Sequence, residues 1–401
     1  MRQAPTALSS TFSLRFGRGC VDGRPHRSYR RGAPSFAPSM ALQAFRDELE
    51  ATAAALAAPG TGLLAADEST GTIGQRFAAI ALENTEENRR AYRTLLATTE
   101  GLAEHISGVI LYEETLFQAS SPDATGVATP IVELFKQQGI IPGIKVDQGV
   151  EPLAGGLEGE SWCTGLKGLE ERAARYYAQG ARFAKWRAVL RISAGGCPSE
   201  LAVRENAWGL ARYARTVQEQ GLVPIVEPEI LMDGDHDIVT TASVQEWVLR
   251  TVYEALALNG VFLEGSVLKP SLTTAGAASI QRPGPEEVGE FTVRTLSRSV
   301  PAAVPAILFL SGGLSEEDAS CCLQAVNQVA AAGFAPWHLG FSFGRALQHS
   351  CLQQWRGSDR AAGQAALLAR ARANGAASRG AYVPGSEPSD DTTLFVANYS
   401  Y

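Results

Sequence analysis

The sequence predicts a single-domain (β/α)8 or TIM barrel, an α/β fold in which eight parallel strands alternate with helices. Three observations predict it: apolar runs recur about every 40 residues, amphipathic stretches separate them, and glycines end several of those stretches. The apolar runs cover residues 62–69, 108–115, 140–149, 181–190, 223–230, 261–270, 306–313 and 339–347. An open doubly wound sheet is the alternative, but the GxGxxG fingerprint that usually follows its first strand is missing there.

Four of the stretches between the runs end at a glycine, where a left-handed cap would turn the chain toward the next strand. These glycines are Gly139, Gly180, Gly221 and Gly260. Residues 204–219, after the fourth run, place small and aliphatic residues at helical spacing on one face and arginine and glutamate largely on the other. We therefore expect a helix here with one buried face.

The two ends of the chain differ in composition from the barrel, which we expect over residues 41–375. Residues 1–40 contain seven arginines, six serines and one acid, Asp22, which is typical of an organelle transit peptide; a disordered basic tail is the alternative. Residues 376–401 are small, polar and proline-bearing until an aromatic end. We expect this segment to be a flexible tail that ends in Tyr401.

Composition excludes several classes of function. The chain of 401 residues is 45% hydrophobic and 19% charged, and it contains no apolar run of about 18 residues, so we expect no membrane span. Without residues 1–40, 28 basic and 41 acidic residues remain, a formal charge of −13 that does not suit nucleic-acid binding. Six cysteines without metal-finger spacing indicate free thiols, and five isolated histidines do not favour a metal site.

Nearly every apolar run ends in ionisable residues or in serine and glycine, which can bind phosphate. In a (β/α)8 barrel these ends lie on the face that carries the active site. Residues two apart on a strand point the same way, so three pairs are each expected to share a side. Any one pair could be a buried ion pair that serves packing alone, but repetition on most strands favours a common site. The three pairs are Lys145 with Asp147, Lys185 with Arg187, and Glu227 with Glu229.

Lys269 ends the sixth run and is followed at once by Pro270. A partly desolvated lysine near the other cations at a barrel mouth is expected to have a lowered pKa, which favours attack on a carbonyl carbon. A neighbouring carboxylate such as Glu227 could then move protons as water leaves. Gly312 and Gly313 after a strand allow backbone N–H groups to approach a phosphate, although SGG is also common in plain turns.

Eight segments, in order, closely resemble class I fructose-1,6-bisphosphate aldolases over roughly residues 45–401. They are LLAADESTGT (63–72), ENRRAYR (87–93), GIKVD (143–147), ARFAKWRAVL (181–190), VPIVEPEIL (223–231), LEGSVLKPS (263–271), FLSGG (309–313) and FSFGRAL (341–347). Two further segments, residues 160–166 and 335–338, are more similar to the plastid branch of the family than to the cytosolic one.

The resemblance implies a role for each catalytic position. Lys269 resembles the lysine that forms a Schiff base with C2 of the ketose, and Glu227 resembles the acid and base for loss of water from the carbinolamine. Glu229 stands beside Glu227 in a charge-balancing role. Lys185 resembles the cation that holds Glu227 and the intermediate, and Asp67 resembles the base that takes the proton of the C4 hydroxyl.

The resemblance also implies two phosphate sites and a mobile acid. Ser311, Gly312 and Arg345 resemble the C1-phosphate site, with Gly313 and Gly344 among the substrate-binding positions. Ser69, Arg76, Lys145 and Arg187 resemble contacts to the C6 phosphate. Tyr401 resembles the C-terminal tyrosine that exchanges the enamine proton.

Three positions depart from the commonest family pattern. Gln75 and Gln148 stand where lysines are usual, and Leu314 replaces a polar residue. Two fewer cations are expected to weaken attraction for the C6 phosphate, whereas the residues for the carbon chemistry are all present.

The resemblance implies an enzyme that needs no metal or organic cofactor and reversibly cleaves fructose 1,6-bisphosphate in glycolysis, gluconeogenesis and the Calvin cycle. It further implies a homotetramer in the plastid stroma, with sugar phosphates as its partners. The alternatives are another Schiff-base lyase such as a transaldolase, a metal-dependent enzyme using Asp233, Asp235, His236 and Asp237, and a catalytically inactive scaffold. The sequence leaves open the subunit number, the cleavage site of the leader, the preference between fructose and sedoheptulose bisphosphates, and any redox role of Cys321 and Cys322.

Overall fold

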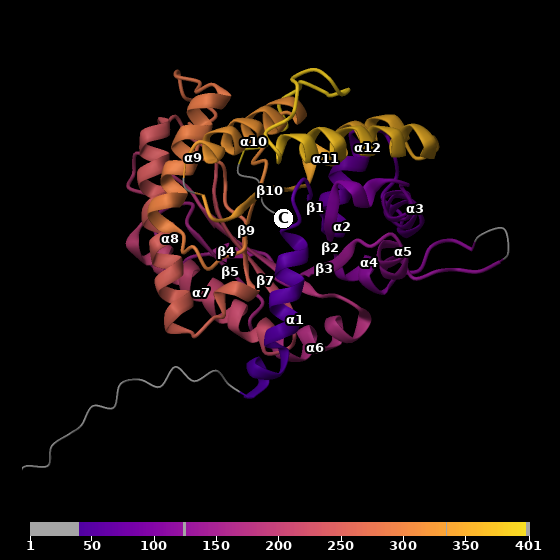
Figure 1. Ribbon diagram of the computed structural model, residues 1–401, viewed down its shortest axis with the longest axis horizontal. Coiled ribbons are helices and arrows are strands. Elements are labelled where there is room, and N and C mark those ends of the chain that lie inside the picture. Colours follow the sequence, from indigo (N-terminus) through magenta and orange to yellow (C-terminus); the bar gives the residue numbers. More distant parts are fainter. Residues whose placement is uncertain (1–39, 123–125, 334, 398–401) are drawn as a thin grey trace, which may run out of the picture. The chain divides into compact units, whose positions relative to one another are not determined.

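A closed barrel of eight parallel strands forms the centre of the protein (Figure 1). The computed structural model describes residues 40–122, 126–333 and 335–397, and every count given below refers to these. The strands follow one another around the barrel in the order β1, β10, β9, β8, β7, β6, β3, β2. They are β1 (Gly62–Ala66), β2 (Ile106–Leu111), β3 (Ile141–Lys145), β6 (Phe183–Leu190), β7 (Val223–Ile230), β8 (Val267–Leu268), β9 (Ala306–Phe309) and β10 (His338–Phe343).

Helices surround the barrel and cover the outer faces of its strands (Figure 1). They are α1 (Met40–Leu56), α2 (Thr70–Ala78), α3 (Glu86–Ala97), α4 (Glu113–Phe117), α5 (Ile131–Gln137), α6 (Leu169–Gln179), α7 (Glu200–Gln218), α8 (Ile238–Leu258), α9 (Pro285–Ser299), α10 (Glu316–Ala331), α11 (Arg345–Trp355) and α12 (Arg360–Ala377), with short 3-10 turns η1 (Leu102–Glu104) and η2 (Leu263–Gly265). The predicted (β/α)8 barrel is thus confirmed, and the open sheet is wrong.

All eight predicted runs overlap a barrel strand, but the sixth run differs from the expectation. Residues 261–266 include the turn η2, and only Val267–Leu268 pair with the neighbouring strands. Apolar content misled the prediction, because Phe262 is buried against the inside of the barrel without being part of a strand.

The expected caps and the expected amphipathic helix are present. The four glycines that end the helical stretches all have positive φ angles, between 64° and 114°. Helix α7 begins at Ser199, whose side chain accepts a hydrogen bond from the backbone N–H of Ala202. Its apolar stripe, which includes Leu210 and Ala214, is buried, while Arg204 is exposed.

The apolar core has two parts. The larger part fills the layer between the strands and the surrounding helices, and the smaller part fills the inside of the barrel. Helix α1 contributes Leu42, Leu49, Ala53 and Leu56 to the inner part and contacts β2, β7, β9 and η2. Because these strands lie on different sides of the barrel, α1 closes the end at which the strands begin.

Two features were not predicted from the sequence. A short antiparallel hairpin of β4 (Val150–Pro152) and β5 (Ser161–Cys163) follows β3, and strands of three residues are too short to give a recognisable alternation. Beyond α12, the chain runs back over the barrel, and Leu394 N donates to the carbonyl of Gly313 at 3.0 Å. None of the described helices combines the length and the apolarity of a membrane span.

Candidate active site

Charged side chains from four strands meet inside the end of the barrel at which the strands finish. Lys145 is the last residue of β3, Lys185 and Arg187 lie on β6, Glu227 and Glu229 lie on β7, and Lys269 follows β8. All six are buried, and so is Asp67 after β1. Burying this many charges is costly unless each one is paired, so their pairing decides what the site can do.

Lys185 is the centre of the network. Its ammonium nitrogen lies 2.8 Å from Asp67 Oδ2, 3.6 Å from Glu227 Oε2 and 3.8 Å from Asp147 Oδ2. Burial raises the pKa of Asp67, but the ammonium groups of Lys185 and Lys269 outweigh it and bring that pKa down to about 2. Asp67 is therefore ionised at neutral pH.

Lys269 reaches the same network through Glu227. Its ammonium nitrogen lies 3.1 Å from Glu227 Oε1, and both side chains are at most 3% exposed. Glu227 thus contacts two lysines, one with each oxygen. A carboxylate in this position can exchange a proton with the Lys269 amine and with groups bound to it.

Two further ion pairs flank the centre. Lys145 contacts Asp147 at 2.7 Å, and Arg187 Nε donates to Glu229. In both acids burial raises the pKa but the neighbouring cations lower it further: Lys185 and Lys145 act on Asp147, and Arg187 acts on Glu229. These pairs keep the charges of the central residues balanced.

A small cavity lies beside Lys269. It is lined by Ala65, Arg76, Arg187, Glu227, Glu229, Lys269, Leu310, Ser311, Gly312, Ser342, Gly344 and Arg345. The lining carries the amine of Lys269, the carboxylates of Glu227 and Glu229, and the arginines Arg76, Arg187 and Arg345. A ligand with a reactive carbonyl group and a phosphate would match this lining.

The predicted site residues fall into three groups. Nine of them line this cavity, and Asp67, Lys185 and Lys145 join it through the ion pairs described above. Ser69 instead caps α2, accepting from Thr72 N, and Gly313 contacts the C-terminal segment. Tyr401 lies outside the described residues.

Four residues of the site were not predicted, among them Leu310, which lines the cavity after β9. Ser342 is a buried polar residue in the apolar strand β10, Ala65 lines the cavity from β1, and Glu68 binds Arg76. A lone serine between two phenylalanines, and an acid directly after a strand, were the available signals.

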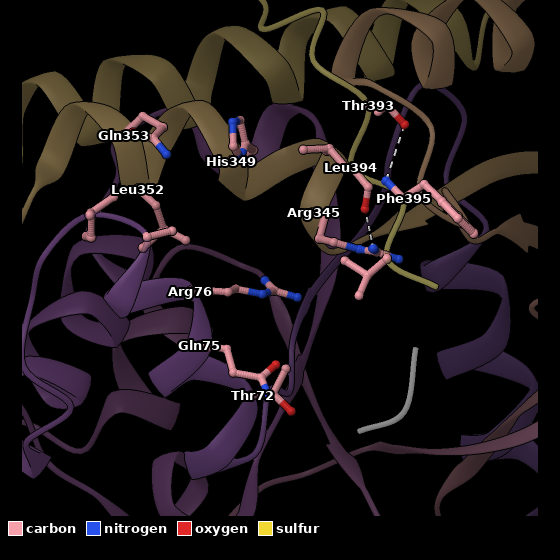
Figure 2. Close-up of a pocket in the computed structure, with 13 residues that line it drawn as sticks. Thr72, Gln75, Arg76, Arg345, His349, Leu352, Gln353, Thr393, Leu394 and Phe395 are labelled. Carbon is pink, nitrogen blue, oxygen red and sulfur yellow. Dashed lines mark hydrogen bonds between the residues drawn. The ribbon is translucent and has the colours of Figure 1, made fainter. Parts of the chain in front are cut away.

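A second, more open pocket adjoins the cavity (Figure 2). It lies between α2, α11 and the C-terminal segment and shares Arg76 and Arg345 with the cavity. Figure 2 shows both arginines extending into it and the hydrogen bond from Arg345 to the carbonyl of Leu394. Gln75, where a lysine is usual in the family that the sequence resembles, lines this pocket beside Arg76.

The loop considered as a metal site has another role. Asp237 caps α8 by accepting a hydrogen bond from Thr240 N at 2.7 Å. Burial lowers the pKa of His236. Within residues 40–122, 126–333 and 335–397, no group of three or more His, Cys, Asp or Glu side chains is arranged to hold a metal ion.

Comparison with known proteins agrees with this geometry. The family model described as "Fructose-bisphosphate aldolase class-I" matches residues 48–401. The chain belongs to the class I fructose-bisphosphate aldolases.

Similar proteins of this family come from plants and from a parasite. "Fructose-bisphosphate aldolase 3, chloroplastic" of Arabidopsis thaliana is 50% identical over 384 residues, 94% of this chain and 95% of the relative. "Fructose-bisphosphate aldolase 6, cytosolic", also of Arabidopsis thaliana, is 53% identical over 361 residues, 89% of this chain and 98% of the relative. A solved structure of fructose-bisphosphate aldolase from Plasmodium falciparum, in complex with TRAP and a small molecule inhibitor, is 50% identical with a TM-score of 0.82, covering 87% of this chain and 97% of that one.

Membership of the class I aldolases decides among the alternatives. The protein is an aldehyde-lyase that reversibly cleaves fructose 1,6-bisphosphate to dihydroxyacetone phosphate and glyceraldehyde 3-phosphate. The inactive scaffold, the transaldolase and the metal-dependent enzyme are therefore rejected. Both chloroplastic and cytosolic aldolases are among the similar proteins, so similarity alone does not decide the compartment.

Proposed function

We propose that the aldolase works through a Schiff base on Lys269 and that each buried charge has the role described below. The observation that carries the proposal is the buried contact of 3.1 Å between Lys269 Nζ and Glu227 Oε1. An amine attacks a carbonyl only as the free base, and a carboxylate at this distance can accept its proton.

The ketose binds with its C1 phosphate beside Arg345 and Ser311 in the cavity. Arg345 offers a planar fork to the phosphate oxygens, and the backbone around Ser311 and Gly312 can approach them closely. The resemblance groups Arg76 with the C6-phosphate contacts. Because Arg76 lines the same cavity as Arg345 and Ser311, we assign it to the C1 phosphate instead.

The Lys269 amine then adds to C2, forming a C–N bond while the carbonyl oxygen becomes a hydroxyl group. Glu227 donates a proton to this hydroxyl, water leaves, and an iminium ion remains. Lys185 lies 3.6 Å from Glu227 and stabilises its carboxylate after the proton has gone.

Asp67 next takes the proton of the C4 hydroxyl. The electrons of the C3–C4 bond move into the iminium ion and give an enamine, and glyceraldehyde 3-phosphate leaves. Tyr401, which lies outside the described residues, is proposed to protonate the enamine at C3. Water then hydrolyses the imine and releases dihydroxyacetone phosphate and free Lys269.

Trapping the imine tests the proposal. Borohydride added with dihydroxyacetone phosphate should reduce the imine to a stable secondary amine, and mass spectrometry of peptides should place the added mass on Lys269. Lys145→Met, a change of another buried lysine at the same end of the barrel, should still be labelled. A wild-type enzyme that turns over but gains no mass at Lys269 rules out the mechanism.

We also propose that the enzyme is a homotetramer of the plastid stroma acting in the Calvin cycle. We assign residues 1–40 to a transit leader, because they are rich in arginine and serine. Residues 41–375 are assigned to the barrel, and residues 376–401 are assigned to a flexible tail. Chloroplastic and cytosolic aldolases are both among the similar proteins, so the support for the plastid comes from the composition of residues 1–40. N-terminal sequencing of protein recovered after import into isolated plastids, and light scattering of that protein, test the two claims separately.

A further inference from the structure

Glu68 is a buried carboxylate between β1 and α2 that no step of the proposed reaction uses. Its side chain is 1% exposed, and both of its oxygens accept hydrogen bonds. Oε1 accepts from Arg76 Nη1 and from Gln348 Nε2 at 3.0 Å, and Oε2 accepts from Arg93 Nη2 at 2.6 Å. A buried carboxylate needs such complete pairing to be tolerated. The pairing alone does not explain why a carboxylate is present at this position.

Two guanidinium groups hold the carboxylate of Glu68. Two arginines, Arg76 and Arg93, face the single carboxylate of Glu68. Burial raises the pKa of Glu68, but these two guanidinium groups lower it further, so the residue stays ionised near neutral pH. Arg93 is 3% exposed and holds the second oxygen of Glu68, so the carboxylate that contacts Arg76 is fixed from its buried side.

Arg76 lies where its guanidinium group can act on substrate. It is in the last turn of α2, its side chain is 14% exposed, and it lines the active-site cavity together with Arg345 and Ser311. Its Nη2 atom is 3.9 Å from the point at which a side chain on Gly344 would begin. Since Glu68 holds Nη1, it determines how the plane of the guanidinium group is turned toward the cavity.

Gln348 connects Glu68 to the helix that carries the other phosphate arginine. Gln348 lies on α11, which begins at Arg345, and it also donates to the carbonyl of Ala65 at 2.8 Å. Its side-chain oxygen accepts from Tyr92 OH at 3.0 Å. Glu68 is therefore tied to β1, α3 and α11 at once, so its position is fixed by three elements.

We propose that Glu68 is a positioning residue that orients Arg76 toward the C1 phosphate of the sugar, while Arg93 holds the other oxygen of its carboxylate. The inference rests on the proposed binding of that phosphate at Arg76 and Arg345. Glu68 thus affects the binding of the phosphate ester of the ketose through Arg76, without contacting it.

Glu68→Gln tests this, because the amide keeps the shape but removes the charge that holds Arg76. We expect KM for fructose 1,6-bisphosphate and the inhibition constant of inorganic phosphate to rise by about tenfold, with kcat changed by less than about threefold. In an Arg76→Ala background the same change should add less than about twofold to KM, since the two residues act as one unit. A general packing defect would instead lower kcat and act equally in both backgrounds.

Glu68→Asp provides the second variant if Glu68→Gln does not fold, because it keeps a buried carboxylate against Arg93. It should give a smaller rise in KM that is again lost in the Arg76→Ala background. A wild-type KM in a folded Glu68→Gln enzyme, or equal rises in KM with and without Arg76, would overturn the inference. Loss of imine trapping in the wild-type enzyme would instead contradict the proposed mechanism and leave the phosphate measurements to decide about Glu68.

Discussion

Lys185 and Asp67 form an ion pair across the inside of the barrel, with 2.8 Å between Nζ and Oδ2. Their strands, β6 and β1, are not neighbours, because β2 and β3 lie between them in the barrel wall. The pair therefore fixes opposite sides of the site relative to each other. It also brings the proposed C4 base within reach of the cation that contacts Glu227.

Replacing Lys185 by Met should damage both stability and catalysis. The change leaves Asp67, Asp147 and Glu227 without their common cation in a buried site, and we expect the free energy of unfolding to fall by about 3–5 kcal/mol. We also expect kcat to fall by at least about a hundredfold. Urea unfolding and steady-state kinetics measure the two effects. Lys185→Arg, which keeps the charge, should lose less stability, and a Met variant with wild-type kcat would contradict the proposed role.

The free energy of unfolding should decrease at acid pH, and part of this decrease should depend on Asp67. Its pKa is lowered to about 2, because the ammonium groups of Lys185 and Lys269 outweigh the effect of burial. In the unfolded chain this carboxyl has its ordinary pKa of 3.8. At pH values above 3.8 the lowered pKa therefore stabilises the folded protein by about 2 kcal/mol, and this contribution is lost as the pH falls toward 2. Asp67→Asn removes this titration, so its free energy of unfolding should decline less than that of the wild type between pH values of about 4.5 and 2. Parallel declines in urea unfolding experiments would contradict the pairing.

Substitutions of Glu227 and Glu229 should affect different kinetic constants: kcat for Glu227 and KM for Glu229. Glu227 contacts Lys269 and Lys185, so Glu227→Gln should lower kcat by about 10²–10⁴-fold and slow imine trapping. Glu229 contacts Arg187, so Glu229→Gln should act mainly on KM through the orientation of that arginine. Rapid-quench trapping with borohydride measures the imine step directly. Equal rates of trapping in the two variants would show that Glu227 has no special role.

Gln75→Lys should strengthen phosphate binding. Gln75 lines the pocket beside Arg76, and a cation there should lower KM for the bisphosphate by about two- to fivefold at low salt. The gain should shrink as ionic strength rises, since an added charge near solvent is screened. Gln75→Glu is the matched control and should raise KM. If both variants shift KM in the same direction, electrostatic attraction is not the cause.

Gly313→Ala should detach the C-terminal segment. Gly313 has a φ angle of 109°, and a side chain there would begin 2.8 Å from the Cα atom of Phe395. We expect faster proteolysis near Leu394 and a raised KM, because Arg345 donates to the carbonyl of that residue. Gly209→Ala, in α7 with no atom within 4 Å of the new methyl group, should leave both unchanged and stabilise the helix by up to about 1 kcal/mol. An unaltered rate of proteolysis in the Gly313 variant would show that the segment tolerates the clash.

The fold could be predicted from the sequence because its signals are local and repeated. Each strand is an apolar run, each helix has one apolar face, and the glycines after four helices have the positive φ angles that such caps require. The sixth run was the exception. Its first residues are apolar because Phe262 packs inside the barrel, and burial alone does not distinguish a strand from a 3-10 turn.

The site could be predicted less completely, because pairing depends on distances across the barrel. Spacing placed Lys185 and Arg187 on one side of their strand, but it did not show that Lys185 contacts Asp67 while Arg187 contacts Glu229. The contact of Glu68 with Arg93 joins residues 25 positions apart in sequence. Such contacts follow only from the closure of the barrel.

Helix α1 sets a limit on how far maturation of the chain can proceed. Leu42 is 3% exposed and belongs to the inner core that seals the end of the barrel opposite the active site. A processing protease that cut beyond Leu42 would begin to remove this seal and expose the apolar lining to water. If residues 1–40 are a leader that is removed, as proposed above, a cut that leaves this seal intact falls at or before residue 42.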